Sequence, residues 1–141
     1  MMKKKLVSRA SNDEIGKAVS GLKKFGFVHS IILFGSQAKR TERTDSDVDL
    51  CIIPEPHVDV SLKERIALNN AVPEHIDISL FGELPVYMRK RVFLEGKVLY
   101  TEDPYYILTL AKENDLEYSR YQKMKKDYHK GVMKRVRLRL G

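Results

Sequence analysis

The chain has 141 residues, of which 43% are hydrophobic and 32% charged, and this composition is typical of one globular domain that buries a core. Its net charge of +7 is concentrated near the C-terminus, where nine Lys or Arg residues between Arg120 and Arg139 outweigh a single acid. No apolar stretch approaches the roughly 18 residues of a membrane span, and the Lys-rich start lacks the apolar run of a signal peptide, so we expect a cytoplasmic protein.

Helix and strand patterns alternate along the chain. In chain order they predict a helix over residues 11–26, a strand over 27–34, a short helix over 36–42, a strand over 48–53, a helix over 61–70, a strand over 75–81, a helix over 85–96, a strand over 97–100 and a long helix after Pro104. Ser11 and Glu14 have the spacing of a capping box, and Gly26 is placed to end the first helix. These elements predict a small mixed α/β (α+β) domain over residues 1–103 and a helical, basic extension over residues 104–141.

The second and third strands differ in their patterns. Residues 50–53 are continuously apolar, so the single cysteine, Cys51, is expected to be a buried and inert thiol. Residues 75–81 alternate apolar side chains with Asp77 and Ser79, which indicates a half-buried strand with one polar face.

The segment GSQAKRTERTDSDVDL, residues 35–50, carries the chemistry that the sequence predicts. Gly35 and Ser36 follow an apolar strand, where backbone N–H groups at a strand-to-helix turn can hold phosphate oxygens. Asp47 and Asp49 share one face of the next strand, so their carboxylates can converge on one metal ion. The segment therefore combines a phosphate-binding turn with a pair of metal ligands.

A third carboxylate on a neighbouring strand would complete a two-metal site. Asp77 is the candidate, because it lies on the polar face of the third strand, and we expect it to help receive the proton of an attacking hydroxyl. Magnesium is the expected ion, since it prefers oxygen ligands. Asp45 precedes the strand and is expected to cap a turn rather than to bind metal.

The chain resembles the minimal nucleotidyltransferases of the DNA polymerase β superfamily, whose signature is Gly-Ser, ten residues, and then Asp-x-Asp. The resemblance extends over roughly residues 11–103 and includes residues 75–81 and residues 95–100. It implies a polymerase β palm-like fold that binds ATP with Mg²⁺. It also implies the roles of the site residues, with metal held by Asp47, Asp49 and Asp77 and the outer phosphates held by Gly35 and Ser36.

The short segment after Ser36 departs from this family at two positions. Gln37 stands where many relatives have Arg, and Arg40 stands where they have Gly, whereas Ala38 and Arg43 fit the usual pattern. We therefore expect the phosphate contacts of this segment to come from Lys39 and Arg43, with a solvated helix face as the alternative.

Relatives in the minimal group often act as antitoxins beside a helical HEPN ribonuclease, transferring AMP to a tyrosine of that partner. The resemblance thus implies a protein adenylyltransferase that silences a HEPN-type toxin. Two alternatives stay open: an antitoxin that acts by contact alone, and transfer to RNA bound by the basic tail.

The sequence leaves open which role the surface of the long helix after Pro104 has. Its tyrosines are candidates for a partner-binding or self-modified strip, or for plain packing; they are Tyr105, Tyr106, Tyr118, Tyr121 and Tyr128. Its basic end is a candidate RNA arm, a surface for an acidic partner, or a solvated face, and its apolar stripe is compatible with a homodimer. The histidines His29, His57 and His75 lack metal-ligand spacing and are expected to be structural or solvated.

Overall fold

The computed structural model describes residues 12–35 and 48–140. In chain order its elements are α1 (Asn12–Leu22), β1 (Val28–Phe34), β2 (Val48–Pro54), α2 (Leu62–Asn70), β3 (Ile76–Leu80), the 3-10 helix η2 (Phe81–Glu83), α3 (Val86–Glu95), β4 (Lys97–Thr101) and α4 (Pro104–Leu140). Each helix and strand that the sequence predicts over the described residues is present. The capping box at Ser11 and the short helix over residues 36–42 lie outside the described residues.

The four strands form one mixed sheet in the order β3-β2-β1-β4. β1 pairs antiparallel with both β2 and β4, whereas β2 pairs parallel with β3. The chain between β2 and β3 contains α2, as a parallel pair requires a crossover rather than a tight turn. This mixed sheet with flanking helices is the fold class that the sequence predicts.

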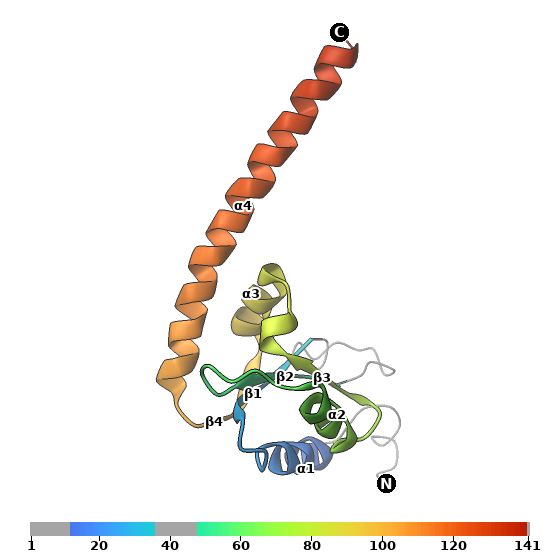
Figure 1. The fold of residues 1–141 in the computed structure, drawn as a ribbon, viewed down its shortest axis with the longest axis vertical. Helices are drawn as coiled ribbons and strands as arrows, with labels where there is room; N and C mark the ends of the chain where they lie inside the picture. Colours follow the sequence, from blue (N-terminus) through green and yellow to red (C-terminus); the bar gives the residue numbers. More distant parts are fainter. Residues whose placement is uncertain (1–11, 36–47, 141) are drawn as a thin grey trace.

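Helices cover both faces of the sheet and make a three-layer domain (Figure 1). On one face, Leu22 of α1 and Leu68 of α2 pack against Ile31 and Leu33 of β1. On the other face, α3 and the first turns of α4 cover a second core around Ile32. Both faces of β1 are therefore apolar, and all its residues from Val28 to Phe34 are buried. Such continuous burial explains why the sequence of β1 shows no alternation.

α1 ends earlier than the sequence predicts, at Leu22 instead of near Gly26. The chain tightens after Leu22, because the N–H of Phe25 donates to the carbonyl of Leu22 at 3.1 Å and breaks the α-helical pattern. This turn lets Phe25 and Phe27 pack together, with ring centroids 5.6 Å apart, against the core beneath β1. The packing of these two aromatic rings therefore ends the helix before the chain reaches the glycine.

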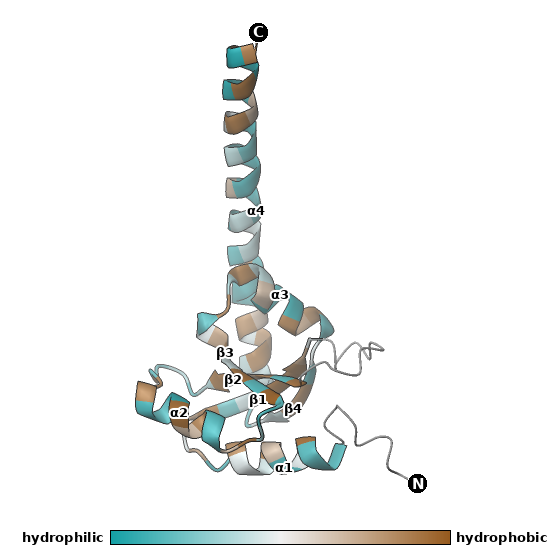
Figure 2. Ribbon diagram, turned by 90° about the vertical axis from the view of Figure 1, so that its right-hand side faces the viewer, coloured by the Kyte–Doolittle hydropathy of each residue, from teal (hydrophilic) through white to brown (hydrophobic). Residues whose placement is uncertain are grey.

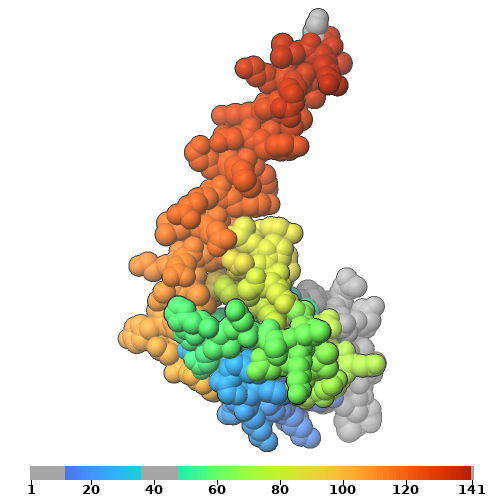
Figure 3. Space-filling model, in the orientation of Figure 1, coloured from blue at the N-terminus to red at the C-terminus, as the bar shows by residue number. Residues whose placement is uncertain are grey.

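α4 extends well beyond the rest of the domain (Figure 1). Its first half is tied to α3 by ion pairs of Lys90 with Asp115, at 2.7 Å, and of Arg89 with Glu117, at 3.2 Å. Tyr121 lies beside Tyr87 of α3, with ring centroids 6.0 Å apart. Beyond that residue the described part of α4 forms no ion pair or ring contact with the rest of the domain, and it projects away from it (Figures 1 and 3).

The free half of α4 carries both apolar and basic side chains. Figure 2 shows hydrophobic positions continuing to its tip, where Leu138 and Leu140 are 74% and 82% exposed. None of the helices in the described ranges combines the length and apolar character that a membrane-spanning segment requires. The division of the chain at residue 104 into two domains stays a prediction.

The tyrosines of α4 separate into two groups. Tyr106 packs edge-on against His29, and Tyr118 and Tyr121 lie side by side next to α3. Tyr105 and Tyr128 are 75% and 70% exposed. Plain packing therefore accounts for the first group, and two tyrosines are accessible on the helix surface.

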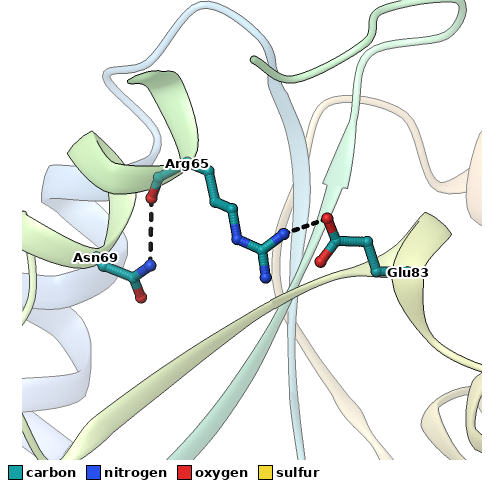
Figure 4. Close-up of polar contacts among 3 residues, drawn as sticks. All are labelled: Arg65, Asn69 and Glu83. Carbon is teal, nitrogen blue, oxygen red and sulfur yellow. Dashed lines mark hydrogen bonds and ion pairs between the residues drawn. The ribbon is translucent and has the colours of Figure 1, made fainter. Parts of the chain in front are cut away.

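An ion pair bridges the edge of the sheet at β3. Arg65 of α2 reaches across to Glu83 of η2, and the carbonyl of Arg65 accepts a hydrogen bond from Asn69 (Figure 4). No local pattern of residues predicts η2, which is only three residues long and is stabilised by this contact and by packing of Phe81 on the second core. Both charges are partly exposed, so the pair contributes about 0–1 kcal/mol.

Candidate active site

The end of β1 brings the backbone close to a carboxylate. Gly35 follows the last residue of β1 and has φ +83°, a conformation that favours glycine. A Cβ on Gly35 would lie 2.4 Å from Oδ2 of Asp49. The side chain of Asp49 therefore lies directly against the Cα of Gly35, and only a residue without a side chain leaves room for it.

Asp49 is also in register with the second carboxylate that the sequence singles out. In the sheet, Asp49 is the partner of Phe34 on one side and of Asp77 on the other. Parallel neighbours at the same register point to the same face, about 4.8 Å apart between strands. Asp49 and Asp77 therefore lie side by side, each as the second residue of its strand.

The neighbouring residues fix the face on which the two carboxylates lie. Val48 and Leu50 of β2 and Ile76 of β3 point into the core beneath α1 and α2. Because side chains alternate along a strand, Asp49 and Asp77 point to the opposite face. Asp49 is half-buried and Asp77 is exposed.

Three of the predicted site residues are therefore brought together: Gly35, Asp49 and Asp77. Asp47, Ser36, Lys39 and Arg43 lie outside the described residues, as does Asp45, and their roles stay predictions. The sequence indicated the polar face of β3 through its alternation, but it did not indicate which residue of β2 is level with Asp77.

Comparison with known proteins covers the part of the chain that carries these residues. Residues 17–105 match the family described as polymerase beta, nucleotidyltransferase, and this range contains the segment from Gly35 through Asp77. A protein of Methanocaldococcus jannaschii named as a candidate protein adenylyltransferase is 29% identical over 76 residues, which cover 54% of this chain and 58% of that protein. The chain thus spans less than two thirds of the length of this relative.

Solved structures share the fold. A toxin–antitoxin structure with the ATP analogue AMP-PNP superimposes with a TM-score of 0.67 at 20% identity, covering 88% of this chain and 99% of the other. A complex of tri-AMPylated HEPN toxin and MNT antitoxin from Shewanella oneidensis gives 0.59 at 18% identity, covering 86% and 94%. At such identities the likeness establishes the fold, whereas the sequence match extends over more than half of the chain. The protein belongs to the polymerase beta nucleotidyltransferase family.

Proposed function

We propose that the protein is a Mg²⁺-dependent nucleotidyltransferase that moves AMP from ATP onto a tyrosine hydroxyl of a HEPN-type toxin and so acts as its antitoxin. The observation that carries the proposal is the in-register pair Asp49 and Asp77 beside the Cα of Gly35. Two neighbouring carboxylates on one face of a sheet repel each other, and a divalent cation bound between them would offset that repulsion.

The donor set fits magnesium. Asp49 and Asp77 offer carboxylate oxygens on adjacent strands, and Asp47, two residues before Asp49, would add a third. Bound Mg²⁺ supplies charge neutralisation for the phosphates and alignment of the attacking and leaving oxygens. The space that a Cβ of Gly35 would fill is left for the carboxylate of Asp49.

The protein groups supply binding and proton transfer. The backbone N–H of Gly35 and the residues Ser36, Lys39 and Arg43 would hold the outer phosphates of ATP. The acceptor hydroxyl oxygen attacks the α-phosphorus, the bond from that phosphorus to the pyrophosphate oxygen breaks, and pyrophosphate leaves. Asp77 is exposed and accepts the hydroxyl proton.

The choice of a tyrosine acceptor on a toxin rests on the relatives. One similar solved structure contains a tri-AMPylated HEPN toxin with its MNT antitoxin, and the archaeal relative is named for protein adenylylation. The exposed half of α4 offers a surface on which such a partner could be held while its tyrosine reaches the carboxylate pair.

The test is incubation of the protein with Mg²⁺, ATP labelled at the α-phosphate, and the product of a neighbouring HEPN gene. We expect label on the partner, and we expect it to disappear in Asp49→Asn and in Asp77→Asn. Asp59→Asn is the matched control, because Asp59 is an exposed aspartate in the loop before α2. Label that persists at the wild-type level in both site variants would overturn the assignment.

Two other outcomes identify the alternatives. Inhibition of the toxin without label transfer, unaffected by Asp77→Asn, would identify an antitoxin that acts by contact alone. Label found on added RNA, and lost when the basic end of α4 is removed, would identify RNA as the acceptor. The exposed basic residues from Lys123 to Arg139 are the observation that keeps RNA as the second candidate.

A further inference from the structure

The end of the sheet opposite Gly35 and Asp49 holds a second group of potential ligands. His29 lies near the start of β1, Glu55 directly follows β2, and Glu102 directly follows β4. Because β2 and β4 both run antiparallel to β1, their ends meet the beginning of β1. One ring nitrogen of His29 and one carboxylate oxygen of each glutamate lie within 4.8 Å of one another.

The backbone of all three residues is held by the sheet. The N–H of Glu55 donates to the carbonyl of Phe27 at 2.8 Å, and the N–H of Glu102 donates to the carbonyl of His29 at 3.1 Å. The register of β1 against β2 shifts between Val28 and Ser30, so His29 occupies a β-bulge. Bulges redirect a side chain, and here the bulge aims the imidazole at the two carboxylates.

His29 is oriented as metal-bound histidines are. Its side chain is 4% exposed, and its Nδ1 lies 2.7 Å from Oγ of Ser30, whose hydroxyl donates to Oγ1 of Thr101 at 2.8 Å. Since the Ser30 proton is used on Thr101, Nδ1 is the donor in the first bond, and Nε2 keeps its lone pair. A buried imidazole whose far nitrogen is fixed by a hydroxyl is the outer-shell arrangement of a metal site.

The two glutamates also fit a cation between them. One carboxylate oxygen of Glu55 and one of Glu102 lie within 4.8 Å of each other. Two carboxylates this close share either a proton or a positive ion. The hydroxyl of Tyr100 also donates to Oε2 of Glu102, at 3.4 Å.

We propose that His29, Glu55 and Glu102 form a binding site for a divalent zinc ion, separate from the nucleotidyltransferase site. One imidazole nitrogen and two carboxylate oxygens match the ligand types of Zn²⁺, with the fourth position left for water. Ligands about 2.1 Å from a tetrahedral zinc lie about 3.4 Å from one another, so small side-chain rotations bring the three atoms into range. Bound zinc ties β1, β2 and β4 together at one end of the sheet.

The experiment measures zinc binding by calorimetry and thermal unfolding with and without ZnCl₂, using untagged protein. All proteins carry Asp49→Asn and Asp77→Asn, so that the carboxylate pair at the other end of the sheet contributes little. We expect one zinc per chain and a higher unfolding temperature with zinc. Glu102→Gln is expected to weaken zinc binding at least about 10-fold, an effect that even outer-shell partners produce.

The controls keep structural effects apart from loss of a ligand. Glu113→Gln removes an exposed carboxylate of α4 outside the cluster and is expected to bind zinc as the parent does. His29→Gln tests the buried ligand, while Glu102→Gln changes an exposed side chain and leaves the core intact. Zinc affinity and zinc-dependent stabilisation that are the same in Glu102→Gln as in its parent would overturn the proposal.

Discussion

The carboxylate of Asp49 lies where a side chain of residue 35 would stand. A Cβ on Gly35 would approach Oδ2 of Asp49 to 2.4 Å and its Cγ to 3.2 Å. Two features require glycine at this position: its φ of +83° and this close contact with Asp49. The turn that would hold phosphate and the carboxylate that would hold metal are therefore fitted to each other.

Gly35→Ala is expected to impair AMP transfer far more than folding. The added methyl group pushes the Asp49 carboxylate away from its position, and a displacement of about 1 Å costs about 10²-fold in rate. The strained backbone costs about 1–2 kcal/mol of stability. Initial rates of label transfer and thermal unfolding measure the two effects. A variant with a normal rate would show that the position of Asp49 is unimportant for transfer.

Gly96→Ala is expected to destabilise the fold. A Cβ on Gly96, which joins α3 to β4, would lie 2.6 Å from Cγ2 of Ile32 and 3.0 Å from the carbonyl oxygen of Leu33, in the middle of the sheet. We expect a loss of about 1–3 kcal/mol, the usual range for overpacking. Denaturant unfolding is the measurement.

Gly16→Ala is the matched control for that substitution. Gly16 lies inside α1, and nothing lies within 4 Å of an added Cβ. Alanine has the higher helix propensity, so this variant is expected to gain about 0.5–1 kcal/mol. Equal effects of the two substitutions would contradict the close packing of Gly96 on β1.

Cys51 is expected to resist thiol reagents until the protein unfolds. Burial raises the pKa of this thiol from 9.0 to about 12, although the charge of Arg89 lowers it in part. The thiolate is the reactive form, so labelling at pH 8 should follow global unfolding. Above pH 9 the unfolded chain releases the thiol proton before the folded one does, so stability should fall as pH rises toward 12. The fall should be smaller in Cys51→Ala, because the raised pKa values of Tyr100 and Tyr106 also contribute to it. Rapid labelling of the native protein would contradict the burial.

Removal of residues 123–141 is expected to leave the domain as stable as before. Among the described residues, Tyr121 makes the last ring contact of α4 with α3, and the helix beyond it projects into solvent. The unfolding temperature measures this. A longer deletion from Asp115 is the control, since it removes the partners of Lys90 and Arg89 and is expected to lower that temperature. Destabilisation by the short deletion would show that the distal helix packs on the domain.

The parts of the fold that the sequence predicts are those with strong local signals. Ser61 and Glu64 form a capping box at the start of α2, and the apolar run around Cys51 is buried, as its pattern indicates. The predicted end of α1 was wrong by four residues. The packing of Phe25 and Phe27 on the core is a tertiary effect that the local sequence does not indicate.

The two sites differ in how much of them the sequence reveals. The motif that contains Asp49 is continuous, and the alternation around Asp77 shows its face, so both residues were predictable. Their register was not, because it depends on the path of the crossover through α2. Our prediction that His29 lacks metal-ligand spacing considers only distances along the sequence. Glu55 and Glu102 approach His29 only through the pairing of three strands.

The parallel pairing of β2 with β3 has a consequence for the order of folding. β1 and β2 are neighbours in sequence and can pair early, whereas β3 joins them only after the chain has returned through α2 to the other end of the sheet. Contacts between distant parts of a chain form late, because closing the intervening loop costs entropy. A chain that has formed only its first two strands therefore carries Asp49 without Asp77, so transfer activity should return during refolding no sooner than the third strand docks.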